Sequence, residues 1–346
     1  MDTKPYRGGM PTAPEFTPWH AADAAAWIAR PRADDDKYSR GVLGVGTGSA
    51  QYPGAAVLGV QAAARTGLGM IRYQGPAAAA QLVLQRRPEV VVGPGRVQAW
   101  LLGSGINADD RAPDTTAMLQ AALHEALPTI CDAGALDLVL SHLGDTAAGA
   151  SSGVTGSGGP TETDAPGRQS GRLTVITPHF RELAGLLGRA AARGIVPSGI
   201  APSGWAPTAE DVERAPGDWA VLAAETLGVT VLLKGAVTLV AAPGGIRLQV
   251  SGAPAWLATA GSGDVLGGIL GALLATQSEQ LRTNPRALPA LAATAAWIHA
   301  DAAHRASQGG PIAALDVADA VPRTIAALLV GPAALRPETA GPTAHD

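Results

Sequence analysis

A loop of small residues that ends in an acid is the part of this sequence best suited to chemistry. Residues 258–264 read Ala-Thr-Ala-Gly-Ser-Gly-Asp and lead directly into an apolar stretch that we expect to be helical. The first backbone N–H groups of a helix have no partner inside it, and the helix dipole adds positive potential there. Glycines in the loop let the backbone approach an anion closely. We therefore predict a phosphate site formed by Gly261, Ser262 and Gly263.

Asp264, directly after this loop, has two interpretations. Aspartate is favoured as the cap at a helix start, which would make the residue structural. A carboxylate beside a phosphate site can also take the proton from a hydroxyl that attacks the terminal phosphate of a nucleotide. The Gly-Ser-Gly sequence before Asp264 favours the second interpretation, a catalytic base.

Other phosphate and metal motifs are missing from the chain. It contains no G-x-x-x-x-G-K-[ST] sequence, so it is not a P-loop enzyme. The glycines at 44–48 do not complete the dinucleotide-binding pattern G-x-G-x-x-G, and no Cys/His set has zinc spacing. Cys131 is the only cysteine, which excludes an intrachain disulfide.

The elements that position these residues alternate between short apolar strands and Ala/Leu-rich helices. This alternation predicts an α/β fold with a mainly parallel central sheet covered by helices on both faces. The strands are predicted at 42–45, 89–92, 99–102, 129–131, 173–176, 229–233, 237–242 and 246–250. The helices are predicted at 20–29, 55–66, 115–126, 182–187, 209–227, 264–275, 289–306 and 316–328.

Composition suggests how the chain is divided. We expect an N-terminal leader at 1–38, a single domain at 39–332 and a flexible tail at 333–346. Residues 144–171 contain mostly Gly, Ser, Thr, Ala and Pro, so they cannot bury enough apolar surface to offset their ordering entropy. This stretch is predicted to be a disordered surface insertion.

Charge and hydropathy exclude several classes of partner. The net charge is −4 and basic residues do not cluster, which argues against a nucleic-acid partner. No apolar stretch reaches the roughly 20 residues that a membrane helix needs. Since no signal peptide is recognisable either, we expect a cytoplasmic protein.

Six segments, together with the loop at 258–264, resemble the family of ADP-dependent NAD(P)H-hydrate dehydratases, relatives of ribokinase-type kinases. They occur in the family's order and extend over roughly residues 37–328. They are Tyr-Pro-Gly-Ala-Ala at 52–56, Arg-Thr-Gly-Leu-Gly at 65–69, Gly-Ser-Gly at 103–105, Asp-Ala-Gly-Ala-Leu at 132–136, Thr-Pro-His-Phe-Arg-Glu at 177–182 and Lys-Gly-Ala-Val-Thr at 234–238. The resemblance implies a ribokinase-like three-layer α/β/α sandwich.

The chain departs from the family pattern at three places. Ser104 stands where the family usually has proline, and Phe180-Arg181 replace a frequent Pro-Gly. Residues 251–256 lack the asparagine that often precedes the phosphate loop, which affects part of the expected substrate contact.

The resemblance implies a repair reaction on the S-epimer of hydrated NADH or NADPH. ADP or ATP, with Mg²⁺, phosphorylates the ring hydroxyl, and phosphate then leaves. Asp264 would be the catalytic base. The nucleotide would be bound by Lys234, Gly235, Ala236, Val237, Thr238, Gly261, Ser262 and Gly263. The NAD(P)H hydrate would be bound by Ala55, Ala56, Gly103, Gly105, Asp132, His179 and Asp264. Glu182 would hold Mg²⁺ through water, and the family suggests a homo-oligomer, a tetramer.

Each of these assignments has a structural alternative. Glu182 is favoured near a helix start by the dipole alone, and Asp132 could cap the helix that follows it. Lys234 could be a solvated strand-end residue, His179 a hydrogen-bonded structural histidine, and the small residues could serve close packing. At the level of function, a small-molecule kinase of the same fold and a non-catalytic nucleotide-binding protein remain alternatives.

Overall fold

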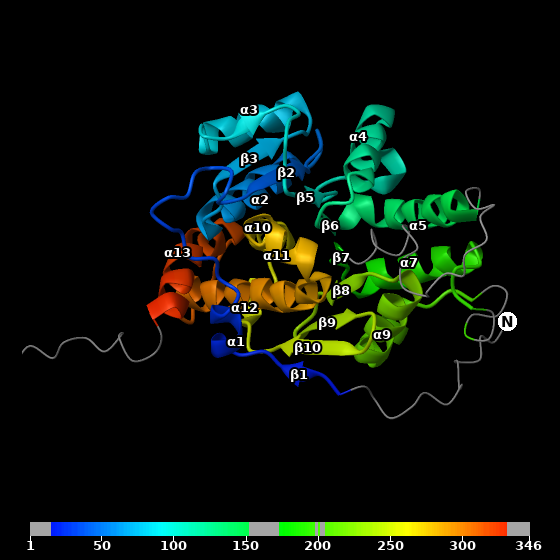
Figure 1. Cartoon of the computed structure of the whole chain (residues 1–346). Coiled ribbons are helices and arrows are strands. Elements are labelled where there is room, and N and C mark those ends of the chain that lie inside the picture. The colour runs from blue at the N-terminus through cyan, green and yellow to red at the C-terminus, as the bar shows by residue number, and fades with distance from the viewer. Residues whose placement is uncertain (1–14, 152–172, 198–199, 201–204, 331–346) are drawn as a thin grey trace, which may run out of the picture.

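A single sheet organises the computed structural model, which describes residues 15–151, 173–197, 200 and 205–330 (Figure 1). Within these ranges ten strands lie in the order β1-β10-β9-β8-β7-β6-β5-β2-β3-β4. β9 is antiparallel to both of its neighbours, and the remaining pairs are parallel, as predicted. The strands are β1 Thr17–Pro18, β2 Val42–Gly46, β3 Met70–Tyr73, β4 Val91–Val92, β5 Ala99–Leu102, β6 Thr129–Cys131, β7 Thr174–Ile176, β8 Thr230–Leu233, β9 Thr238–Ala242 and β10 Ile246–Val250.

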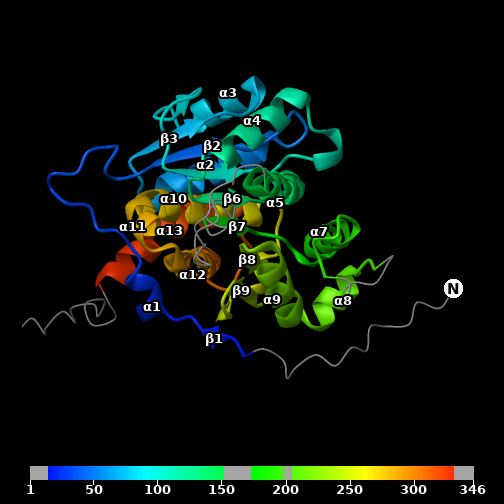
Figure 2. The ribbon, with the colours of Figure 1, turned by 45° about the vertical axis from the view of Figure 1, so that its right-hand side comes forward.

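Helices cover both faces of the sheet and give the predicted three layers (Figures 1 and 2). The first face carries α1 Ala21–Ala25, α2 Pro53–Thr66, α3 Ala77–Arg86, α10 Ser262–Thr276, α11 Ser278–Thr283, α12 Leu288–Ser307 and α13 Ala314–Val330. The second face carries α4 Pro113–His124, α5 Leu136–Ser151, α7 Phe180–Ala192, α8 Ala209–Arg214 and α9 Pro216–Leu227. In the described part of the chain, no helix is long and apolar enough to cross a membrane.

The strands contribute side chains alternately to these two layers. On β5, Leu101 joins the first cluster of buried apolar residues, while Trp100 and Leu102 join the second. On β6, Ile130 and Cys131 divide in the same way. Successive side chains of a strand point to opposite faces, so a strand that is apolar throughout is buried on both sides.

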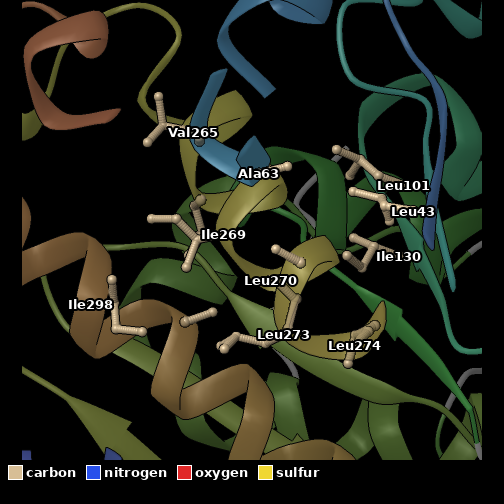
Figure 3. Packing of buried hydrophobic residues seen from close by; sticks show 14 of the residues in the cluster. Leu43, Ala63, Leu101, Ile130, Val265, Ile269, Leu270, Leu273, Leu274 and Ile298 are labelled. Carbon is tan, nitrogen blue, oxygen red and sulfur yellow. The ribbon is translucent and has the colours of Figure 1, made fainter. Parts of the chain in front are cut away.

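Helix α10 lies at the centre of the first layer and is buried from Val265 to Ala275. It packs against α2 and α12, and Ile269, Leu270 and Leu273 lie in the cluster with side chains from the sheet (Figure 3). A helix that is apolar on all sides is stable only inside a core. This packing fixes the start of α10, where the predicted phosphate loop ends.

Three differences from the predicted elements have physical reasons. β3, α3 and α11 were not predicted, because short or alanine-rich stretches carry weak hydrophobic periodicity. α5 was also not predicted, because its second half lies in the Gly-, Ala- and Thr-rich stretch. The single helix predicted at 209–227 is divided into α8 and α9, because Pro216 has no N–H to continue a helix. Helix α5 continues through residues 144–151, which the prediction placed in a disordered insertion.

The described part of the predicted leader belongs to the fold. β1 extends the sheet by pairing with β10, and α1 packs against α12 and α13. Phe16 and Ala24 are buried. The remainder of the predicted leader, residues 152–171 of the predicted insertion and the predicted tail at 333–346 lie outside the described residues.

Candidate active site

The carboxyl ends of the parallel strands bring the predicted site residues to one edge of the sheet. Residues 103–105 follow β5, Asp132 follows β6, Thr177 follows β7 and Lys234 follows β8. Backbone pairing continues past the strands, because Lys234 forms a parallel bridge with His179. Ligands of open α/β sheets bind at this edge.

Asp132 is the buried centre of this group. Its Oδ1 accepts hydrogen bonds from Thr177 Oγ1 at 2.9 Å and from Lys234 Nζ at 2.8 Å, and its Oδ2 accepts one from Ser104 Oγ at 2.9 Å. Burial opposes ionisation, but the Lys234 ammonium and the three hydrogen bonds outweigh it and lower the pKa of Asp132. Asp132 is therefore an ionised carboxylate with both oxygens engaged inside the protein. It precedes the turn at Ala133–Ala135 but makes no side-chain cap there, so the capping interpretation is wrong.

Lys234 connects this carboxylate to the phosphate loop. Its Nζ lies 3.7 Å from Glu182 Oε2, and a Cβ atom placed on Gly263 would lie 3.7 Å from the same nitrogen. Burial alone would lower the pKa of Lys234, but the carboxylates of Asp132, Glu182 and Asp264 raise it. Lys234 is therefore a protonated lysine that Asp132 holds beside the loop, and it is not a solvated lysine at a strand end.

Asp264 is the third residue of α10, and the helix cap is Gly261, so the capping interpretation of Asp264 is wrong. Gly261 has φ +86°, a left-handed conformation that favours glycine. In the described part of the chain, the carboxylate of Asp264 receives no hydrogen bond. Burial, together with the negative charge of Asp132, raises the pKa of Asp264 to about 7, while Lys234 opposes the shift.

The two aspartates therefore have opposite properties. Asp132 is held ionised by three hydrogen bonds. Asp264 is half-buried, receives no hydrogen bond from the described residues and has a pKa of about 7. A base works best when its pKa lies near the working pH. Pairs of acids whose environments separate their pKa values are typical of enzyme active sites. This arrangement suits Asp264 to proton transfer and Asp132 to holding a cation.

His179 and Glu182 form a capping box at the start of α7. Glu182 Oε2 accepts a hydrogen bond from the backbone N–H of His179 at 2.8 Å, and His179 Nδ1 accepts one from the Glu182 N–H at 3.3 Å. Both residues therefore have the structural role that was the alternative to a site role, because they cap the start of α7. Both also lie at the site, since Glu182 contacts Lys234.

No group of three or more His, Cys, Asp or Glu side chains able to hold a metal occurs among the described residues. A dedicated protein cage for Mg²⁺ is therefore lacking in these ranges. Mg²⁺ commonly keeps several waters and binds through one carboxylate and nucleotide phosphates. Glu182 fits that mode, because its side chain is partly exposed and its Oε1 accepts no hydrogen bond within the described ranges.

A cavity of about 580 Å³ adjoins the phosphate loop, a volume typical of small-ligand sites. Of the predicted nucleotide-binding residues, it is lined by Lys234, Gly235, Ala236, Thr238, Ser262 and Gly263. Val237 is not in this lining, and the residue is 42% exposed. Gly261 is also outside the lining, where a Cβ atom would lie 2.3 Å from Leu58.

The small residues predicted to bind NAD(P)H hydrate are closely packed. Gly105 has φ +67°, and a Cβ atom there would lie 2.4 Å from the Cβ of Ala55. Ala56 is fully buried in the first apolar cluster. Close packing of the 103–105 loop on α2 is therefore one reason for small side chains at these positions.

Sequence reasoning missed three polar residues at this site. Ser104 and Thr177 lie within the sequence motifs at 103–105 and 177–182, but only the fold shows that they donate hydrogen bonds to Asp132. His299 lines the cavity from α12 and is only 7% exposed. The only indication of His299 in the sequence was that a histidine stands among the alanines of the helix predicted at 289–306.

Comparison with known proteins identifies the family of this chain. The model of the NAD(P)H-hydrate dehydratase family matches residues 43–153 and 161–323. An ADP-dependent (S)-NAD(P)H-hydrate dehydratase of Neisseria meningitidis is 31% identical over 305 residues, which are 83% of this chain and 84% of that protein.

Two further relatives show how the chain compares in extent and fold. A bifunctional NAD(P)H-hydrate repair enzyme of Mycobacterium tuberculosis is 40% identical over 268 residues, 75% of this chain. The chain spans only 46% of the length of that relative. An ADP/ATP-dependent NAD(P)H-hydrate dehydratase of Bacillus subtilis, crystallised with ATP and Mg²⁺, has a TM-score of 0.65 at 21% identity. The alignment covers 90% of this chain and 98% of that one, which supports the ribokinase-like fold.

Proposed function

Because this chain belongs to the NAD(P)H-hydrate dehydratase family, we propose that it removes water from the hydrated nicotinamide ring of NADH or NADPH, the S-epimer, in a reaction driven by ADP or ATP. The observation that carries the proposal is the state of Asp264 at the start of a buried helix. Its carboxylate receives no hydrogen bond from the described residues, has a pKa of about 7 and lies near Lys234, which Asp132 holds in place.

In the first step, Asp264 takes the proton from the ring hydroxyl. The hydroxyl oxygen attacks the terminal phosphorus of the nucleotide, and the bond from that phosphorus to the bridging oxygen breaks. Backbone N–H groups of Ser262 and Gly263, with the Lys234 ammonium, would stabilise the charge on the transferring phosphoryl group. Positioning and charge stabilisation are most of what phosphoryl transfer requires.

In the second step, phosphate leaves the ring carbon and the neighbouring carbon loses a proton to water, so the ring double bond forms again. With ADP, the products are NAD(P)H, AMP and phosphate. Phosphorylation matters because hydroxide is a poor leaving group and phosphate is a good one. Mg²⁺, when bound with the nucleotide, would neutralise phosphate charge, and Glu182 would hold it through water.

We assign Asp132 a positioning role. Both of its oxygens accept hydrogen bonds, from Ser104, Thr177 and Lys234, and the residue is buried, so little of the carboxylate is accessible to substrate. We propose that Asp132 holds the Lys234 ammonium beside Gly263. His179, Ala55, Gly103 and Gly105 stay predicted contacts of the NAD(P)H hydrate, and a tetramer stays an expectation of the family resemblance.

The direct test supplies the purified protein with NADH hydrate, ADP and Mg²⁺. Absorbance of the reduced nicotinamide ring should recover, with one AMP and one phosphate formed per NADH. If absorbance stays flat while a small alcohol becomes phosphorylated, the protein is a kinase of this fold. Nucleotide binding without either product would identify a non-catalytic binding protein.

The pH dependence of kcat/KM should follow the ionisation of Asp264. The base works only when it has lost its proton, so kcat/KM should fall about tenfold per pH unit below about pH 7. An ordinary aspartate would give that decline only below about pH 4. A value of kcat/KM that stays constant between about pH 5 and 7 would show that Asp264 is not the base.

A further inference from the structure

Five arginines that are scattered along the sequence are gathered by the fold around one cavity. This arginine cavity has a volume of about 820 Å³ and lies between α2, α3, α12 and α13. Its described lining contains two acids, Asp316 and Asp319. The arginines of the lining are Arg65, Arg86, Arg87, Arg305 and Arg323. Positive charge is therefore concentrated here, although the net charge of the whole chain is −4.

The arginine cavity is separate from the candidate active site. Ala55 and Ala56, predicted contacts of the NAD(P)H hydrate, lie in the first turn of α2, whereas Arg65 lies in its last turn. The ten residues from Ala55 to Arg65 correspond to about 15 Å along a helix. The described residues that line the cavity beside the phosphate loop do not include any that line the arginine cavity. The arginines thus lie outside both predicted subsites of the reaction.

The two acids of the lining do not balance its arginines. Asp319 Oδ2 accepts a hydrogen bond from Arg86 at 3.2 Å, and Asp319 Oδ1 lies 3.9 Å from Arg65 Nε, so one carboxylate faces two guanidinium groups. Asp316 accepts a hydrogen bond from the backbone N–H of Ala313 at the start of α13. Arg323 is exposed and has no hydrogen bond or ion pair within the described part of the chain.

A buried amide holds part of this wall in a fixed arrangement. Gln61 lines the cavity and is only 2% exposed. Its Oε1 accepts a hydrogen bond from Arg87 Nε at 2.6 Å, and its amide nitrogen donates to Asp319. Arg87 also pairs with Glu89 at 3.3 Å. The polar groups of the wall are therefore held in position before any ligand binds.

Helix dipoles explain only part of this arrangement. Arg65, Arg86 and Arg305 each lie in the last turn of a helix, where the dipole favours a cation. The dipole acts on each helix separately, so it gives no reason for three helices to direct their arginines at one cavity. Arg323 lies inside α13, away from its end. The side chains of Arg65, Arg86 and Arg305 are 38–40% exposed, although Arg305 pairs with Asp301, so a ligand can reach them.

We propose that the arginine cavity is a second anion site, which binds a diphosphate group. Guanidinium groups bind phosphate oxygens through pairs of parallel hydrogen bonds. An anion with several charges can contact Arg65, Arg86 and Arg323 from one position, whereas a single carboxylate would leave most of them without a partner. None of the described lining residues is aromatic, so the phosphates and not a base would be recognised. The proposal does not depend on the dehydratase activity.

Titration with inorganic pyrophosphate, followed by calorimetry, tests the proposal. The phosphate loop can bind the same anion, so the number of bound ions is measured together with each Kd. We expect two ions per chain in the unmodified protein and one in Arg86→Gln/Arg323→Gln, whose cavity should bind about 10- to 100-fold more weakly because charge-assisted contacts are lost. If the loop binds no pyrophosphate, the numbers become one and none. An unchanged number of ions in the double variant would overturn the proposal.

Arg282→Gln is the matched control, because Arg282 is an exposed arginine of α11 outside the cavity. It should change neither Kd by more than about twofold. An equal loss of affinity in this control would mean that pyrophosphate responds only to overall charge, and the proposal would be wrong. Thermal unfolding verifies that each variant folds. Arg323→Gln alone breaks no ion pair among the described residues, so it provides the same test if Arg86→Gln destabilises the protein.

Titration with ADP distinguishes two sources of the diphosphate group. A second ADP that is lost in Arg86→Gln/Arg323→Gln would show that the cavity accepts the diphosphate of a nucleotide. A single ADP, together with cavity-dependent binding of pyrophosphate, would identify free diphosphate as the ligand. Crystals soaked with pyrophosphate provide an independent measurement. Density beside Arg86 and Arg323 is expected, and density at the phosphate loop alone would contradict the second site.

Discussion

Asp264→Asn is expected to lower kcat by about 10²- to 10⁴-fold, the usual contribution of a positioned general base. Asparagine has nearly the same shape but cannot accept the hydroxyl proton. The backbone N–H groups at the start of α10 and the Lys234 ammonium remain, so the Kd of ADP should change by less than about threefold. Single-turnover kinetics and calorimetry on the same preparation measure both quantities.

The same substitution should stabilise the folded protein at alkaline pH. The pKa of Asp264 is about 7 in the folded state and about 4 in an unfolded chain. Between these values the folded state binds more protons, so stability falls as pH rises through this window. Asp264→Asn removes that loss, which amounts to up to about 4 kcal/mol above pH 7. The gain in Tm should be larger at about pH 8 than at about pH 5.

These two readouts together distinguish a catalytic from a structural role. If Asp264 supported the fold, its replacement would lower Tm and activity together. Wild-type turnover in Asp264→Asn would contradict the proposed mechanism. A lower Tm at about pH 8 would contradict the unfavourable environment of the carboxylate.

Lys234→Met should destabilise the fold by about 3–5 kcal/mol near neutral pH, the usual effect of removing one partner of a buried ion pair. Asp132, with its side chain only 7% exposed, would lose its counter-ion and one of its hydrogen bonds. Nucleotide affinity should fall about 10- to 100-fold, because a charge-assisted contact to phosphate is lost. Urea unfolding and calorimetry measure the two effects.

A second substitution separates the two effects of Lys234. In Asp132→Asn/Lys234→Met the buried charge is removed with its partner, so much of the lost stability should return. The nucleotide affinity should stay low, because the ammonium beside Gly263 is still missing. Arg282→Met breaks an exposed ion pair on α11 and, as the control, should change stability by less than about 0.5 kcal/mol. Recovery of affinity in the double variant would mean that Lys234 acts on the nucleotide only through the fold.

The parts of the fold that sequence could predict are those with strong local patterns. Strands such as β2 and β5 are short apolar runs bounded by glycine, and their ends agree with prediction within a residue. The phosphate loop is equally local, since its function depends on small residues directly before an apolar helix. β3 and α3 lack such patterns, because their stability comes from pairing with β2 and packing on α2.

The division of roles between the acids could not be predicted in this way. Asp132 and Asp264 are both aspartates beside an element boundary, and both had capping and functional interpretations. Asp132 is ionised because Ser104, Thr177 and Lys234, distant in sequence, converge on it. His299 was overlooked for the same reason, since only the packing of α12 against α10 places it on the wall of the cavity.

The amino-acid sequence by itself determined the alternation of strands and helices, the glycine-lined loop and the presence of an acid at its end, because these depend on neighbours along the chain. Only the tertiary structure decided which carboxylate is held by hydrogen bonds and which is left free to take a proton. Proton affinity depends on burial and on charges within a few ångströms, and those neighbours come from strands more than a hundred residues apart.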